Sequence, residues 1–306
     1  MEIIKAGTNV NFVGRMKVAT MASLVVIVVS LLSLLIHGGP NLGIDFAGGT
    51  LVQIQFQNPT RVNDIRNALK EHNLENSVIQ QFGYATNNEF LVKTEKSSSE
   101  LEGISAQITE ALATQFDREE FEIRRVEVVG PKVGKDLRQK GIMAMLYAIV
   151  GILIYITWRF EFRYAIGAIV ALIHDVIITV GIFSLLDKEF SLPIIAALLT
   201  IIGYSLNDTI VVYDRIRENI KEIKRRTLGD IINSSINQVL SRTVLTSVTT
   251  LLVVLALFFL GGAVIHDFAF ALLVGILIGT YSSIFIASPT VLAWETLMPS
   301  KKKGKK

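Results

Sequence analysis

Six long, mostly apolar segments constrain the fold of this chain more than any other feature. Each is close to the roughly 20 residues that an α-helix needs to cross about 30 Å of hydrocarbon. The overall composition, 51% hydrophobic and 19% charged, differs only modestly from that of soluble proteins. The clustering of the apolar residues into long runs, and not the overall composition, therefore indicates a membrane protein. The predicted membrane spans are residues 18–36, 142–158, 165–186, 192–213, 239–260 and 268–294.

The distribution of Lys and Arg predicts the orientation of these spans. Basic residues gather before the first span, after the second and fourth, and in the tail 295–306, whereas the loops on the other side hold few. Positive charge marks the cytoplasmic side, so both termini, including residues 1–17, are expected in the cytoplasm. The first segment is too long for a signal peptide and lacks a cleavage pattern, so we expect an uncleaved helix. The net charge of +3 reflects this topology, and no nucleic-acid partner is expected.

The polar stretch 37–141 between the first two spans predicts one domain outside the membrane. Alternating apolar and polar residues predict four strands, and apolar residues at helical spacing predict two helices. Their order, strand, helix, strand, strand, helix, strand, is that of a ferredoxin-like α+β fold. The expected strands are 50–57, 77–82, 89–94 and 120–129, and the helices follow Pro59 and the capping sequence Ser97–Glu100. Without a catalytic pattern, this domain is interpreted as an interaction surface.

Three ionisable residues inside the predicted spans are the candidate functional residues: Asp175, Asp208 and Arg242. A charge in the bilayer interior is costly, so such residues are expected to be paired, to face a wet cavity or to conduct protons. Asp208 and Arg242 fall at similar depths in the fourth and fifth spans, which favours a proton-coupling pair. Alternatively, Arg242 reaches the interface and Asp208 caps a helix break. Asp175 is either part of the same proton path or a neutral packing residue, and His174 is expected to serve in packing or at the interface.

A supporting polar face is predicted on the fifth span. Thr246, Thr249 and Thr250 follow Arg242 at helical spacing, and Asn207 precedes Asp208 in the fourth span. Hydroxyl groups there hold water or bridge helices. The chain has no Cys, and neither a metal cluster nor a cofactor motif is seen, so no metal or cofactor is expected.

Three further segments have mainly structural interpretations. Residues 130–136 resemble a phosphate loop but lack its spacing, and a turn into the second span is expected. Gly275–Gly279 is a small-residue packing motif of the last span. Residues 214–238, which are rich in Lys and Arg, predict an amphipathic cytoplasmic helix along the membrane, against anionic lipid or a partner.

Several motifs together resemble the SecF family of membrane subunits of the bacterial protein-export machinery. The stretches are Gly43-Ile-Asp-Phe-Ala-Gly-Gly49, Val129-Gly-Pro-Lys-Val-Gly134, Gly203-Tyr-Ser-Leu-Asn-Asp-Thr209, Val212-Tyr-Asp-Arg-Ile-Arg-Glu-Asn219 and Ser241-Arg-Thr243. The similarity extends over essentially the whole chain, and the motif around Asp208 is the specific one.

The resemblance implies a six-helix fold related to the RND transporters, with residues 142–294 forming a five-helix bundle beside the first span. It implies a multi-pass protein of the bacterial inner membrane that works with SecD, and with YajC as a further partner, on preproteins crossing the SecYEG channel after the SecA-driven step. The proton-motive force would drive this step without hydrolytic chemistry in the chain. Asp208 and Arg242 match the proton-coupling residues of the family, and the outer domain would engage the emerging preprotein.

Three rival functions remain open from the residues alone. A half-transporter that exports a small apolar solute would need a cavity between repeats and large outer loops. An intramembrane enzyme would need paired catalytic groups, such as Asp175 with Asp208. A structural scaffold would tolerate neutral replacement of every intramembrane charge.

Overall fold

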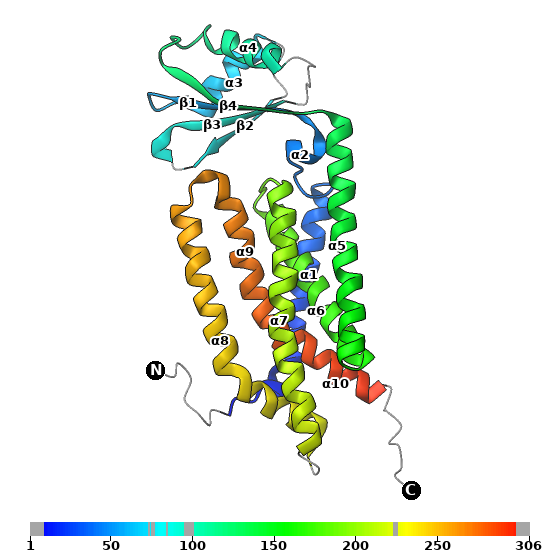
Figure 1. Cartoon of the computed structure of the whole chain (residues 1–306). Helices are drawn as coiled ribbons and strands as arrows, with labels where there is room; N and C mark the ends of the chain where they lie inside the picture. The colour runs from blue at the N-terminus through cyan, green and yellow to red at the C-terminus, as the bar shows by residue number, and fades with distance from the viewer. Residues whose placement is uncertain are drawn as a thin grey trace.

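The computed structural model describes residues 9–72, 74, 77–83, 85–94, 101–222 and 226–297, and it confirms six helical spans. A bundle of long helices carries a small sheet domain over one end (Figure 1). The spans are α1 (Phe12–Ile36), α5 (Pro131–Arg159), α6 (Phe162–Leu185), α7 (Leu192–Glu222), α8 (Leu228–Leu260) and a last one made of α9 (Ala263–Ser282), the π-helical turn η2 (Ser283–Ala287) and α10 (Ser288–Leu297).

The six spans fall into an inner group, which other helices cover, and a peripheral group, which they leave exposed. The apolar lengths of α6, α7 and α9–α10 are about half buried by other helices, whereas those of α1, α5 and α8 are mostly exposed. Since the exposed helices are apolar all round, their free faces suit lipid or another membrane protein. The inner group therefore holds the protected interior of the bundle.

The outer domain has the predicted ferredoxin-like order. Its elements are β1 (Gly49–Phe56), α3 (Val62–Lys70), β2 (Val78–Phe82), the 3₁₀ turn η1 (Ala85–Asn87), β3 (Glu89–Thr94), α4 (Leu101–Leu112) and β4 (Phe121–Val129). The sheet order is β2-β3-β1-β4, and every neighbouring pair is antiparallel. The predicted strands agree with these bounds within one residue. The capping sequence at 97–100 lies outside the described residues.

The two faces of the sheet have different surroundings. Fully buried side chains of the central strands, such as Val52, Ile54 and Val92, pack against Ile65 of α3 and Ile108 of α4. The opposite face is turned toward the helix bundle (Figure 1). Alternation along each strand thus supplies one core face and one face toward the membrane.

A close-packed joint connects the domain to the bundle. The short helix α2 (Ile44–Ala47) packs against α5. Gly48 has a φ of 77°, and a Cβ there would lie 2.9 Å from Cα of Pro131. A Cβ on Gly134 would lie 3.1 Å from the carbonyl oxygen of Phe46. These glycines let α2 touch the first turns of α5.

The structure corrects the prediction for residues 130–136. They do not form a separate turn, because Gly130 is the N-cap of α5 and Pro131 occupies its first turn. Proline suits this position, since its missing N–H would have no helical partner and its φ is already helical. The second span is consequently one continuous helix that starts in the outer joint.

The structure also differs from the prediction for residues 214–238. The described part of this segment extends α7 to Glu222 and starts α8 at Leu228, so these residues are not one helix lying along the membrane. The two extensions pack against each other, and the Asn219 amide donates to the Ser235 hydroxyl at 2.8 Å. A capping box between Thr227 and Asp230 begins α8 anew.

Candidate functional site

Asp208 lies in the protected interior of the bundle. It is 2% exposed. Its Oδ2 atom has no hydrogen-bond partner among the described residues. The hydroxyl side chain facing the carboxyl is Ser247 of α8, and Ser247 Oγ lies 2.7 Å from Thr280 Oγ1 of α9. A buried carboxyl with so few partners is costly when ionised, so Asp208 is suited to change its protonation state.

Asp175 occupies a second buried position and has a full set of partners. It lies in α6 and is 0% exposed. Its Oδ2 accepts hydrogen bonds from Ser205 Oγ of α7 at 2.6 Å and from Ser282 Oγ of α9 at 2.9 Å. Its Oδ1 lies 2.9 Å from Nδ1 of His174. All three inner spans thus meet at this carboxyl.

His174 is drawn into the same cluster. Adjacent residues of a helix point about 100° apart around its axis, yet the His174 and Asp175 side chains hydrogen-bond to each other. His174 is 3% exposed and stacks on Tyr281 with ring centroids 6.3 Å apart. The Tyr281 hydroxyl donates to the carbonyl of Ala19 in α1 at 2.7 Å. His174 is therefore a buried residue of the interior and not an interfacial one.

Hydroxyl groups occupy the space between the two carboxyls. Ser205, which donates to Asp175, lies one helical turn before Asp208 on α7. Ser283 and Thr209 lie 2.8 Å apart, Oγ to Oγ1, across the α7–η2 contact. Asp175 and Asp208 therefore belong to one polar region enclosed by apolar helices.

Glycine spacing brings α9 close enough to complete this region. A Cβ at Gly279 would lie 2.9 Å from Cβ of Ser205, and a Cβ at Gly275 would collide with Ile201. The predicted packing motif is thereby confirmed, and α7 is its partner.

The last span bends beside the cluster. The turn η2 is a π-helix, and Pro289 follows it in α10. Proline cannot donate to the carbonyl four residues back, which favours such an irregular turn. In Figure 1, α10 runs at an angle to α9.

Arg242 does not meet Asp208 within this chain. No hydrogen bond or ion pair joins the two among the residues that the structure describes, and Arg242 is exposed on α8. The residues of α8 that face the interior are Thr243, Ser247 and Val254, which are all buried. The predicted pair is therefore not formed by the isolated chain.

The predicted supporting residues also lie off the interior face. Asn207 and Thr249 are exposed, and Thr246 and Thr250 are half-buried. The three threonine hydroxyls donate to carbonyls of their own helix at 2.9–3.1 Å. The helical spacing was correctly identified, but it did not tell which face of α8 points inward.

Sequence reasoning missed most of the polar partners. They are Ser205, Thr209, Ser247, Thr280, Ser282 and Ser283. One signal was available: Ser205 precedes Asp208 by one turn, and the pair Ser282–Ser283 interrupts an apolar span. Small hydroxyl residues are common in membrane helices, so this signal is weak by itself. Within the described ranges, no group of three or more His, Asp or Glu gathers as metal ligands.

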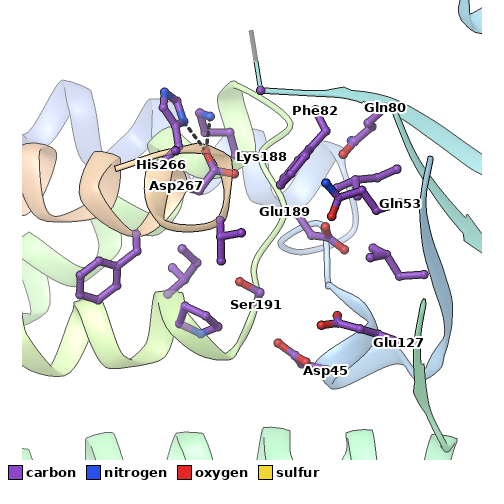
Figure 2. A pocket seen from close by; sticks show the side chains of 18 of the residues that line it. Asp45, Gln53, Gln80, Phe82, Glu127, Lys188, Glu189, Ser191, His266 and Asp267 are labelled. Carbon is purple, nitrogen blue, oxygen red and sulfur yellow. Dashed lines mark hydrogen bonds and ion pairs between the residues drawn. The ribbon is translucent and has the colours of Figure 1, made fainter. Parts of the chain in front are cut away.

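A cavity of about 790 Å³ lies apart from these residues, between the sheet and the outer ends of α7 and α9 (Figure 2). Gln53 and Gln80 line it from the sheet, and an ion pair of Lys188 with Asp267 at 2.6 Å lines it from the bundle. Asp175 and Asp208 are not among its lining residues. The proton-binding candidates are therefore separate from this outer cavity.

Comparisons with known proteins agree with the fold and the motifs. The family described as "Protein export membrane protein SecD/SecF, C-terminal" matches residues 108–297, and the "SecD/SecF GG Motif" matches residues 33–60. The protein translocase subunit SecF of Magnetococcus marinus is 54% identical over 95% of this chain and 94% of its own length. That of Calditerrivibrio nitroreducens is 48% identical over 97% of this chain and 98% of its own.

Two solved structures of longer chains match most of this chain. The crystal structure of SecDF from Thermus thermophilus, described as a translocon-associated membrane protein, matches with a TM-score of 0.87 at 41% identity. A second SecDF structure, in a super-membrane-facing form, matches with a TM-score of 0.71 at 41% identity. This chain is covered to 96% in both but spans only 40% of the length of those SecDF chains. The chain belongs to the SecD/SecF family of protein-export membrane proteins and, within it, to the protein translocase subunits SecF.

Proposed function

We propose that this subunit, together with SecD, uses the proton-motive force to complete the export of preproteins through SecYEG after the SecA-driven step. The observation that carries the proposal is the buried Asp208 carboxyl, whose Oδ2 lacks a partner among the described residues. In this position, the neutral and the ionised forms of the carboxyl differ strongly in free energy. A change in its protonation therefore acts directly on the packing of α7, α8 and α9.

In this proposal, Arg242 supplies the positive charge that compensates the ionised Asp208 carboxylate. Asp208 lies 16 residues from the outer end of α7, and Arg242 lies 18 residues from that of α8. At about 1.5 Å per residue, the two have similar depths of roughly 24 and 27 Å. In the cycle of the assembled complex, the two side chains would approach when Asp208 is ionised and separate when a proton neutralises it, and the neighbouring helices would shift with them. One charge that crosses the membrane field supplies about 2.3 kcal/mol per 100 mV, enough to bias a conformational equilibrium of that size.

The exposed face of α8 supports a partner bundle. Arg242 shares this face with Leu245, Thr249 and Leu252 at helical spacing, and the two leucines are 51% and 61% exposed. Lipid suits leucine but not a guanidinium, which needs a counter-charge or water. A second helix bundle of SecD, with polar groups opposite Arg242, fits this surface.

We place the chain in the bacterial inner membrane with both termini in the cytoplasm and the sheet domain outside, where it meets the emerging preprotein. The Arg and Lys residues of the hairpin between α7 and α8 suit contact with anionic lipid. YajC is a further partner in this proposal. The work is conformational, with no hydrolytic step in this subunit.

The test is export of a secreted reporter in bacteria whose own SecF is replaced by this chain. Asp208→Asn and Arg242→Met are expected to insert normally and to lose the part of export that depends on the proton gradient. Asp214→Asn is the matched control, because Asp214 is an exposed carboxyl of the same helix, paired with Arg159 at 3.4 Å. Wild-type export by both test variants would overturn the proposal and leave the subunit a scaffold.

A further inference from the structure

His174 and Asp175 form a titratable pair that the coupling of Asp208 with Arg242 does not use. Both side chains are almost fully buried, and Nδ1 of His174 lies 2.9 Å from Oδ1 of Asp175. The other ring nitrogen, Nε2, is buried without a hydrogen-bond partner among the described residues. A buried, unpartnered nitrogen beside a carboxyl is an unused proton-binding position.

The partners of Asp175 define how many protons the pair holds. Ser205 and Ser282 both donate hydrogen bonds to Oδ2. Such hydrogen bonds are stronger to an ionised carboxylate than to a neutral carboxyl. Oδ1 then takes the remaining hydrogen bond from His174 Nδ1–H. With Nε2 bare, this pair carries one negative charge inside the bundle. With a proton on Nε2, the pair becomes an imidazolium–carboxylate ion pair of net charge zero.

The groups packed around the pair give Asp175 no other counter-charge. Its single ion pair within the described residues is with His174. The titratable side chains within one helical turn of the two donors, Ser205 and Ser282, are Tyr204 and Asp208 of α7 and Tyr281 of α9. From α1, Ser23 donates to the Tyr281 hydroxyl at 3.0 Å. The stacked Tyr281 ring, anchored through its hydroxyl to α1, holds the imidazole in place.

The pair differs from Asp208 in depth. Asp175 lies 10 residues before the outer end of α6, about 15 Å, which is nearer the outside than Asp208. The Ser205 hydroxyl connects to it from the same helix that carries Asp208. A proton entering from outside therefore reaches the level of this pair first.

We propose that His174 and Asp175 are a second proton-binding centre of the transport cycle, with His174 Nε2 as the site of uptake. Hydronium gives its proton to the Nε2 lone pair, water leaves, and the new imidazolium donates through Nδ1 to Asp175. Return of the proton to water restores the neutral ring. This inference rests on the proposed proton-driven function and adds a residue to it.

The direct test is the protonation state of the imidazole, measured without export. The whole chain is labelled with ¹⁵N-histidine, placed in lipid nanodiscs and observed by NMR from acidic to alkaline pH, in the Asp208→Asn background. With four histidines in the chain, the His174 signal is assigned by its loss in His174→Gln. We expect His174 to titrate, and Asp175→Asn to move the titration to lower pH because the stabilising carboxylate is gone. A single protonation state across the whole range in which the chain stays folded would overturn the proposal.

Export measurements complete the test. His174→Gln is expected to lose gradient-dependent export at normal insertion and thermal stability, whereas His37→Gln, which removes an exposed imidazole of α1, keeps it. Wild-type export by His174→Gln would contradict the role in the cycle. If instead Asp208→Asn exports normally, the proposed function fails, while the NMR result on the pair still stands by itself.

Discussion

At the scale of single residues, the polar interior of this subunit is held together by hydrogen bonds that small hydroxyl side chains make. Asp175 collects its hydrogen bonds from two serines and one histidine, and Asp208 is left with Ser247 nearby. The first carboxyl is stabilised by its partners, whereas the second has few. This contrast in surroundings fits the different roles that we propose for the two acidic residues.

A residue outside the membrane interior ties the outer domain to the helix that carries Asp208. Asp45 Oδ2 accepts a hydrogen bond from the backbone N–H of Leu192, the first residue of α7, at 2.8 Å. Asp45→Ala is expected to lower thermal stability by about 1 kcal/mol because this N–H loses its partner. Asp45→Asn should be nearly neutral, since the amide oxygen still accepts. Equal melting temperatures of the two variants in detergent would contradict this role.

At the scale of elements, the contact between α7 and α9 sets the geometry of the polar cluster. Gly279 lets α9 approach Ser205 so closely that Ser282, one turn further, also reaches Asp175. Since α7 begins beside Asp45 of α2 and carries Asp208, movement of this one helix involves both Asp208 and the sheet domain.

Gly279→Ala is expected to destabilise the bundle by about 1–3 kcal/mol, because the new methyl group would overpack the contact with Ser205. It should also reduce gradient-dependent export. Gly203→Ala is the matched control on α7, since no atom lies within 4 Å of its added Cβ. Thermal unfolding of both variants measures the effect. A Gly279→Ala variant as stable as the control would show that the close approach is not needed.

At the scale of the whole molecule, the sheet domain meets the bundle at the close-packed joint of α2 with α5 and at a second contact with the α6–α7 loop. The segment that follows α1, at Asn41 and Leu42, pairs with the α6–α7 loop, where Phe190 N donates to the Asn41 carbonyl at 2.7 Å. Lys93 of β3 donates to the Leu42 carbonyl at 2.5 Å and pairs with Glu189 at 3.2 Å. The Lys93 and Glu189 side chains are only 18% and 22% exposed, so this contact is largely shielded from water.

Cross-linking tests whether the domain must leave this position. The chain has no Cys, so Lys93→Cys with Glu189→Cys introduces one defined pair. A short bis-maleimide bridge between them is expected to abolish export, because the sheet can no longer separate from the α6–α7 loop. The untreated double variant and each single variant with the reagent should export. Full export by the bridged protein would show that this contact stays closed during the cycle.

The sequence alone determined the large-scale organisation, because its physical causes are local. Twenty-residue apolar runs must become spans, and alternation in 50–57 or 89–94 specifies strands whichever way the rest packs. The motifs around Asp208 likewise indicated the family before any coordinates. Helix ends such as Pro131 and Leu228 were placed less well, because polar residues extend a helix beyond the membrane without an apolar signal.

Tertiary structure decided which polar residues meet. The spacing of Arg242, Thr246 and Thr249 identified one face of α8, but in a helix that is apolar on all sides no pattern distinguishes the inward face from the outward one. Packing against α7 and α9 turned Ser247 inward and left Arg242 exposed. The same packing brought to Asp175 two serines that are 30 and 107 positions away from it along the chain. Such contacts depend on how whole helices fit together, which local sequence does not encode.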